Sequence, residues 1–206
     1  MYADDLILIA VSIHDMETML EVCRLELLWL DMNLNLSKSS AIRIGDRWDA
    51  PISPLTVGGK KVPWAKDIKY LGVVIVALRV FSVDLHGAKV RYFQSLNAIL
   101  GKIGDCSQIS LILSLTATNC VPILFYGLEA CLPTAAQLQS LDFAYKAIFC
   151  KVFKTFDKNV VLQCQYYTGI LPSVYALDLM RLRFLANVRL KPDSPAGFLS
   201  QAVGGG

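Results

Sequence analysis

Two adjacent carboxylates, Asp4 and Asp5, follow Tyr2 and Ala3 and stand directly before the apolar run Leu6–Ile9. Neighbouring carboxylates repel each other, and burying them without compensation is unfavourable. On a regular strand the two side chains would point to opposite faces, whereas in a tight turn they can lie closer together. Mg²⁺ prefers oxygen ligands and usually takes one or two protein carboxylates together with substrate phosphates. The pair is therefore a candidate divalent-metal site, and two such ions can support an in-line displacement at a phosphate.

A plainer interpretation is that the acidic pair is only a polar cap before a strand, since a four-residue motif alone is weak evidence for a catalytic site. The elements that must position the pair begin at residues 5–11, a short apolar run suited to a buried strand. Ser12, with Asp15 three residues later, resembles a helix start. Apolar residues then recur at helical spacing and predict one apolar face on a helix over residues 14–32. These residues are Met16, Met19, Leu20, Cys23, Leu27 and Leu30.

The remaining pattern predicts an α+β protein in which strands precede helices. Gly58-Gly59 is a hairpin signal between two of the expected strands. The expected strands span residues 41–44, 55–57, 61–62 and 70–76. The expected helices span roughly residues 83–103, 107–119, 122–131, 134–153, 159–167 and 173–189. We expect a mixed unit at residues 1–80 with a small mixed or antiparallel sheet and a packed helix, an all-helical unit at 82–190, and a flexible tail at 191–206.

Charge is distributed unevenly, although the net charge of +3 does not by itself indicate a nucleic-acid-binding protein. Residues 1–31 are mainly acidic, and the rest of the chain is mildly basic. An acidic head with a basic body fits a metal centre beside a surface that meets phosphates. Solvated faces of ordinary helices are the alternative explanation.

Other compositional features exclude several classes of site. The six cysteines form no Cys-x-x-Cys pair and have no histidine near them in sequence, so neither a zinc site nor a disulfide framework is expected. The uncharged run Cys106–Leu128 is apolar enough to suggest a membrane span. Its hydroxyl side chains and Pro122 favour two buried helices instead, and no stable membrane association is expected.

Four landmarks, in order along residues 1–129, make this chain resemble the reverse transcriptases of non-LTR (LINE-type) retrotransposons. Residues 1–6 resemble the family's motif C. The helix containing Cys23 and Glu26, which leads into Asn33–Ser39, resembles its motif D region. Residues 68–73 resemble motif E, the primer-grip hairpin of the polymerase palm, and residues 121–129 resemble a segment of the helical thumb.

The resemblance implies catalytic roles for three residues. Asp4 and Asp5 would hold Mg²⁺ or Mn²⁺, and Lys38 would lie near the nucleotide phosphates and assist proton transfer to pyrophosphate. For Lys38 the alternative is a solvated loop lysine. Tyr2 would lie close to the primer terminus and the incoming nucleotide.

The resemblance also implies contacts with nucleic acid. Tyr70, Leu71 and Gly72 would form the turn region that supports the primer, with plain strand packing as the alternative. Basic helical residues would contact template–primer phosphates, which gives salt-sensitive affinity without sequence information. The preferred candidates are Arg79, Lys89 and Arg91. The aromatic residues expected in the core, rather than in base stacking, are Tyr92, Phe93, Phe143, Tyr145, Phe149 and Phe153.

The implied function is that of an RNA-directed DNA polymerase: a partial palm followed by an all-helical thumb-like domain. The intact parent would use an RNA template, a DNA primer and deoxynucleoside triphosphates, in the nucleus or cytoplasm. In the family a third carboxylate comes from motif A, which these residues do not match, so we expect the chain to be inactive alone. The alternative is a non-catalytic nucleic-acid-binding helical module.

Overall fold

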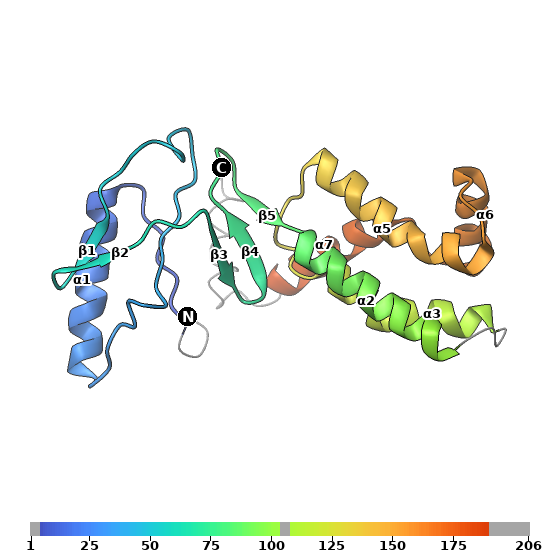
Figure 1. Ribbon diagram of the computed structural model, residues 1–206, viewed down its shortest axis with the longest axis horizontal. Coiled ribbons are helices and arrows are strands. Elements are labelled where there is room, and N and C mark those ends of the chain that lie inside the picture. Colours follow the sequence, from blue (N-terminus) through green and yellow to red (C-terminus); the bar gives the residue numbers. More distant parts are fainter. Residues whose placement is uncertain (1–4, 104–107, 190–206) are drawn as a thin grey trace. The chain divides into compact units, whose positions relative to one another are not determined.

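The computed structural model describes residues 5–103 and 108–189, and the chain divides into two units, residues 1–82 and 83–206. The described part of the first unit contains one helix and small antiparallel sheets, and the described part of the second contains six helices. The predicted α+β class is confirmed, with small sheets near the N-terminus followed by a mostly helical region (Figure 1). The expected tail at residues 191–206 lies outside the described residues.

Helix α1 (Ile13–Trp29) begins where the sequence predicts. Ser12 is the N-cap residue, and its Oγ accepts a hydrogen bond from the Asp15 backbone N–H at 3.1 Å. One side of α1 packs through Met16 and Leu20 against the small core of the first unit. No residue of α1 is fully buried, because the sheet against which it packs has only two short strands.

The first hairpin supplies that core. Strands β1 (Leu55–Val57) and β2 (Lys60–Val62) are antiparallel, and they turn at Gly58-Gly59 as predicted. Both glycines have positive φ, 54° and 76°, the backbone of a type I′ turn. Leu55 and Val57 point to one face because side chains alternate along a strand, and with Val62 they form the buried cluster.

The second hairpin replaces the single strand expected at residues 70–76. Strands β3 (Asp67–Tyr70) and β4 (Val73–Val76) are antiparallel, with Tyr70 paired to Val73. The uninterrupted strand expected from the apolar pattern was a wrong prediction, because Leu71 and Gly72 form a two-residue turn, within the turn region that the resemblance implies. Strand β5 (Ser82–Asp84), at which the chain passes from one unit to the next, completes the sheet order β3-β4-β5.

Two other predicted strands are absent from the described residues. Residues 6–10 have no regular structure, and Ile9 and Val11 are 81% and 104% exposed. Residues 41–44 contribute only an isolated parallel bridge between Ala41 and Trp64. A strand needs a neighbour to pair its backbone N–H and C=O groups, and apolar composition alone does not supply one.

The second unit follows the predicted helix pattern closely. Its helices are α2 (His86–Ile103), α3 (Ile109–Asn119), α4 (Val121–Phe125), α5 (Ala135–Phe153), α6 (Lys158–Thr168) and α7 (Ser173–Arg189). Only α4 is much shorter than expected, ending at Phe125 rather than near residue 131. The break follows from the extended ψ of 124° at Tyr126 and the positive φ of 78° at Gly127.

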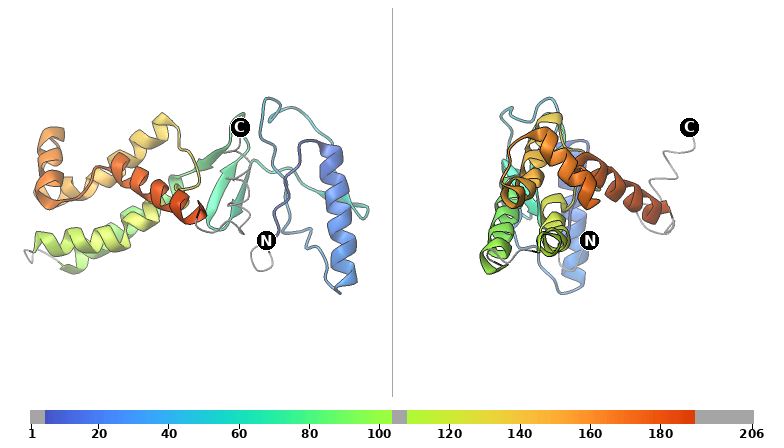
Figure 2. Two further views of the ribbon diagram at one scale, coloured as in Figure 1. Left: turned by 180° about the vertical axis from the view of Figure 1, so that it is seen from behind. Right: turned by 90° about the vertical axis from the view of Figure 1, so that its right-hand side faces the viewer.

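The helices pack around an aromatic and aliphatic core. Helix α2 contacts α3 and α4, and α5 contacts α6 and α7; Figure 2 likewise shows α3 alongside α2. Tyr92, Leu96, Leu124 and Phe149 are at most 1% exposed. Phe125 stacks on Tyr145 with ring centroids 5.6 Å apart, the spacing of a favourable offset aromatic pair.

The uncharged run considered as a membrane span is divided between α3, with 11 residues, and α4, with 5. Within the described part of the chain, no helix is both long and apolar enough to cross a membrane.

Candidate functional site

The acidic pair is only half described. Tyr2 and Asp4 lie outside the described residues, so the predicted geometry of the pair is not defined. Asp5 is exposed and precedes the irregular segment at residues 6–10. Among the described residues no group of three or more His, Cys, Asp or Glu side chains is placed to hold a metal ion. The metal site stays a prediction.

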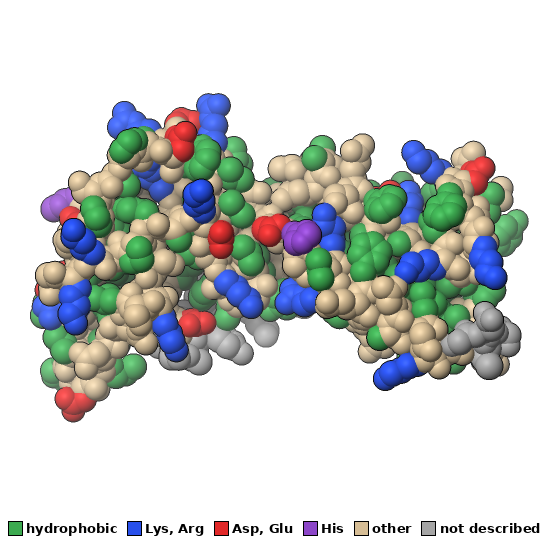
Figure 3. All heavy atoms as spheres, in the orientation of Figure 1, with side chains coloured by type: hydrophobic (Ala, Val, Ile, Leu, Met, Phe, Trp, Pro, Cys, Tyr) green, Lys and Arg blue, Asp and Glu red, His purple; other side chains and the backbone are tan. Residues whose placement is uncertain are grey.

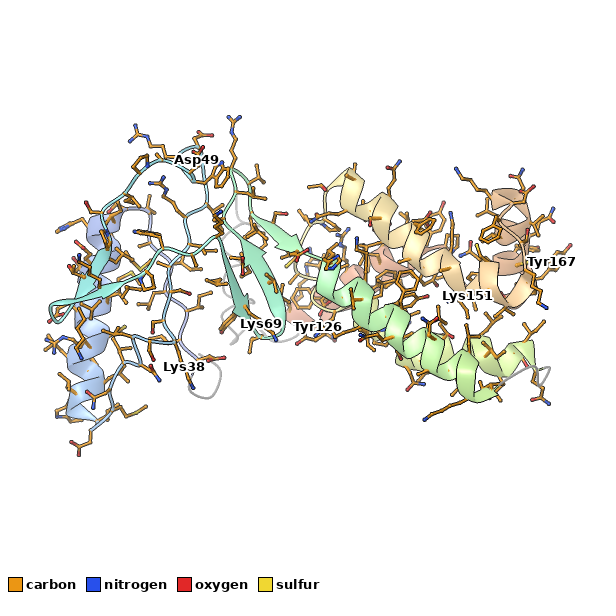
Figure 4. All side chains as sticks on the ribbon, in the orientation of Figure 1. Lys38, Asp49, Lys69, Tyr126, Lys151 and Tyr167 are labelled. Carbon is orange, nitrogen blue, oxygen red and sulfur yellow. The ribbon has the colours of Figure 1, made fainter. Side chains whose placement is uncertain are left out.

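Lys38 lies in a loop that Asn35 organises. The Ser37 hydroxyl donates to Asn35 Oδ1 at 2.7 Å, and the Ser39 hydroxyl donates to the Asn35 carbonyl oxygen at 2.9 Å. The Lys38 backbone N–H donates to the same carbonyl at 3.1 Å. These bonds shape a turn between two serines that leaves the Lys38 side chain exposed (Figure 4). An exposed lysine on a defined turn can approach a phosphate, but no described interaction joins it to Asp5.

The hairpin β3–β4 brings the three predicted primer-support residues together. Tyr70 ends β3, and Leu71 and Gly72 form the turn, with φ of 47° and 84°. The positive φ is favourable for Gly72 but strained for Leu71, because a side chain with a Cβ rarely adopts the left-handed region. The Leu71 side chain is 41% exposed. Lys69, the residue before Tyr70, is exposed as well (Figure 4). The hairpin thus presents a strained apolar side chain at its tip.

The three basic residues predicted to meet phosphates differ in their partners. Arg79 Nε lies 2.7 Å from Asp46 Oδ1, and both side chains are more than three-quarters exposed. Such a surface ion pair is weak and exchangeable. Lys89 Nζ donates to the Ser140 hydroxyl at 2.7 Å and is partly buried, so it joins α2 to α5. Arg91 is exposed and forms no side-chain hydrogen bond or ion pair with any described residue. Of the three, Arg91 is best placed for an added phosphate.

Two tyrosines at the end of α6 were missed by the sequence reasoning. Tyr166 and Tyr167 are 82% and 83% exposed, and their rings meet edge to face at 5.5 Å. The signal that could have found them is helical phase. Val161 and Gln165 lie four residues apart and are the buried positions of α6, so the next two residues turn away from that face.

Phe143 departs from the expectation that it lies in the core. Of the other aromatic residues expected there, Tyr92, Tyr145 and Phe149 are buried and Phe93 and Phe153 are partly buried, whereas Phe143 is 77% exposed. It adjoins Ala144, which is fully buried on the inward face of α5, and Phe143 therefore points outward.

The described groups with perturbed pKa values lie outside the predicted site. Burial raises the pKa of Tyr92 and raises that of Tyr145 to about 12. In the first unit the hydrogen bond from Arg24 lowers the pKa of Glu21. Displaced pKa values can mark catalytic groups, but here they accompany core packing and an ion pair on α1.

Comparison of the chain with protein-family models, with curated proteins and with solved structures found no match.

Proposed function

We propose that this chain is the palm-and-thumb portion of an RNA-directed DNA polymerase of the non-LTR retrotransposon type. One observation supports it above the others. Residues 68–73, which resemble the primer-grip motif, form a tight hairpin with Leu71-Gly72 at its tip. The hairpin follows a capped helix and the Lys38 loop and precedes a helical unit, in the order that the resemblance implies.

In this proposal the acidic pair supplies metal ligands in the intact parent. Asp4 and Asp5 would hold Mg²⁺ or Mn²⁺, and the ions would supply charge stabilisation for attack by the primer 3′-hydroxyl and departure of pyrophosphate. Lys38 approaches the nucleotide phosphates from its exposed turn. Tyr2 and the β3–β4 hairpin hold the primer end. The template is RNA, and deoxynucleoside triphosphates are the substrates.

The experiment is to sequence the transcript upstream of the Met1 codon, express the longer frame, and measure primer extension on an RNA template with Mg²⁺. We expect extension that Asp4→Ala abolishes and Asp15→Ala leaves intact, because Asp15 is occupied at the N-terminus of α1. The 206-residue chain alone should not extend a primer, since the third carboxylate of the family comes from a motif that it does not match. A longer frame without another aspartate-bearing apolar strand, or extension unaffected by Asp4→Ala, would contradict the proposal.

A second candidate function is a non-catalytic nucleic-acid-binding module built on the helical unit. The supporting observation is that Lys and Arg outnumber Asp and Glu there. The described basic residues are Lys89, Arg91, Lys102, Lys146, Lys151, Lys154, Lys158, Arg181, Arg183 and Arg189. This candidate predicts primer–template binding that weakens steeply with salt because counterions are released. Affinity that is insensitive to salt would count against it.

A further inference from the structure

We propose that the second unit carries a binding site for single-stranded nucleic acid at the α5–α6 corner, defined as Lys151, Lys154, Phe156, Lys158, Tyr166 and Tyr167. The inference deepens the nucleic-acid-binding part of the proposed function and rests on it. It assigns a different ligand from the duplex expected at Arg91, and the three aromatic residues of the corner were not among those predicted from the sequence.

The aromatic side chains of the corner are free to accept a base. Tyr166 and Tyr167 are more than four-fifths exposed, and Phe156, in the segment that joins α5 to α6, is 90% exposed. The two tyrosine rings are inclined by 77°, so they present differently oriented faces within one short stretch of helix. Exposed rings on a rigid element are platforms on which unpaired bases stack.

The position of the rings is fixed by packing on the opposite side of α6. This helix packs on α5, with Val161 2% and Gln165 1% exposed. Its N-terminus is capped by Asp157, whose carboxylate accepts hydrogen bonds from the backbone N–H groups of Asn159 and Val160. The left-handed Gly169 ends the helix directly after the tyrosine pair and Thr168. The rings therefore project from a short helix that is defined at both ends.

The positive charge at the corner favours a polyanionic ligand over a neutral one. Lys154 and Lys158 are exposed and form no ion pair with any described residue. Lys151 donates from Nζ to Asn97 Oδ1 at 2.6 Å, a neutral partner that leaves its charge uncompensated. The one acidic residue between them, Asp157, is engaged as the helix cap. Figure 3 shows the same character on the visible face of this unit, where Lys and Arg side chains lie among hydrophobic ones and outnumber acidic ones.

The lysines come from the end of α5 and the start of α6, and the tyrosines come from the end of α6. Lys151, on α5, and Tyr167, on α6, both lie toward the same end of the unit in Figure 4. A surface with both lysines and exposed rings should bind a single strand more tightly than a duplex. Base faces in a duplex are covered by their neighbours, so a duplex would use the lysines but not the rings. A single strand uses both, since its phosphates meet the lysines and its bases stack on the tyrosines.

The test is fluorescence anisotropy on the full chain with three labelled probes: an oligodeoxythymidine, an oligouridine of equal length, and a blunt duplex. For Tyr166→Ala/Tyr167→Ala we expect single-strand affinity to fall by about tenfold or more while duplex affinity changes less than about twofold. Tyr166→Phe/Tyr167→Phe should bind like the wild type, because phenylalanine keeps the ring. Tyr126→Ala, which removes a 55% exposed tyrosine elsewhere in the same unit, is the matched control. Circular dichroism establishes that each variant is folded.

A second arm examines the lysines. Lys154→Gln/Lys158→Gln should lower the slope of log affinity against log salt for the single strand by about 1.4, the value expected when two phosphate contacts are lost. If the slope stayed the same, the proposed phosphate contacts of these two lysines would be wrong.

Several outcomes would overturn the proposal. Absence of single-strand binding, equal losses on single strand and duplex, or a loss in the phenylalanine variant as large as in the alanine variant would each do so. Concentration-dependent self-association in sedimentation that the alanine variant abolishes would assign the rings to a second copy of the chain. If duplex binding persists in the wild type without single-strand binding, only this inference fails. If neither probe binds, the nucleic-acid-binding proposal fails with it.

Discussion

The hydroxyl of Tyr145 donates a hydrogen bond to the backbone carbonyl oxygen of Leu171 at 2.9 Å, and this bond joins α5 to the segment that precedes α7. Tyr145→Phe removes the donor but keeps the ring that stacks on Phe125. We expect the free energy of unfolding to fall by about 1 kcal/mol, the usual net contribution of such a bond. Urea denaturation measures the change. Tyr175→Phe, at a 63% exposed tyrosine of α7, should change it by less than about 0.5 kcal/mol.

The same residue makes stability depend on alkaline pH. Burial raises the pKa of Tyr145 from 10.0 to about 12, so between these values the unfolded chain loses this proton while the folded chain keeps it. The stabilisation is fully present below pH 10 and is lost as pH rises toward 12, by about 2–3 kcal/mol in total. Burial raises the pKa of Tyr92 also, which acts in the same direction.

Urea midpoints at neutral pH and between the two pKa values of Tyr145 test this dependence. Tyr145→Phe should show a smaller alkaline loss than the wild type. Parallel losses in the two proteins would show that Tyr145 does not titrate in this way.

The turns of the two hairpins both have two residues with positive φ, but they differ in sequence. Substitutions at the second turn can therefore test whether Leu71 is retained there for function rather than for stability. Gly58-Gly59 adopts positive φ without strain, whereas Leu71 adopts it with a side chain. Leu71→Asn creates an Asn-Gly turn, which favours this geometry, and should raise the free energy of unfolding by up to about 1 kcal/mol. Gly72→Ala should lower it by about 1 kcal/mol, because alanine is strained at φ of 84°.

If Leu71 supports the primer, as proposed, Leu71→Asn should weaken primer–template binding while it stabilises the protein. A residue whose backbone strain is kept for function should show this combination of higher stability and weaker binding when it is replaced. A variant that is more stable and binds primer–template as tightly as the wild type would remove Leu71 from the proposed contact.

The Gln137 side chain bonds both to the N-cap of its own helix, α5, and to strand β5. Its Oε1 accepts from the Thr134 backbone N–H at 2.9 Å, and its Nε2 donates to the Val83 carbonyl oxygen at 2.7 Å. Gln137→Glu keeps the acceptor for the cap but loses the donor to Val83, and we expect it to cost about 1–2 kcal/mol. Thr134→Ala should cost about 1 kcal/mol by removing the other half of the capping box, whereas Thr134→Ser should be nearly neutral. Thermal unfolding by circular dichroism compares the three variants.

Local signals in the sequence predicted the elements that depend only on neighbouring residues. Ser12 with Asp15 marked the start of α1, and Gly58-Gly59 marked the first hairpin, because caps and two-residue turns are specified by residues three or four positions apart. The helix break expected near Pro122 was likewise close to the observed one between α3 and α4. These features need no knowledge of what packs against them.

Features that depend on a distant partner were not predictable in the same way. The apolar residues 6–10 form no strand, because strand formation requires a neighbour that periodicity cannot supply. The apolar pattern alone did not reveal the turn at Leu71, whose side chain continues the pattern of β3 and β4, whereas the family resemblance did place a turn region at residues 70–72. Phe143 was expected in the core on composition, although its position beside the buried Ala144 turns it outward. The metal pair stays a prediction, because Asp4 lies outside the described residues.

Helix α1 differs from α2 and α5 in how it is retained, since Val22, Leu25 and Trp29 along one of its sides are each more than half exposed. A helix held on one side by a small hairpin can open without disturbing the rest of the molecule. In deuterated solvent its amide hydrogens should therefore be replaced well before those of α5, whose inward residues Ala144 and Phe149 are at most 1% exposed. Mass spectrometry of peptides from the two helices would compare their protection from exchange. We expect the first unit to unfold before the second.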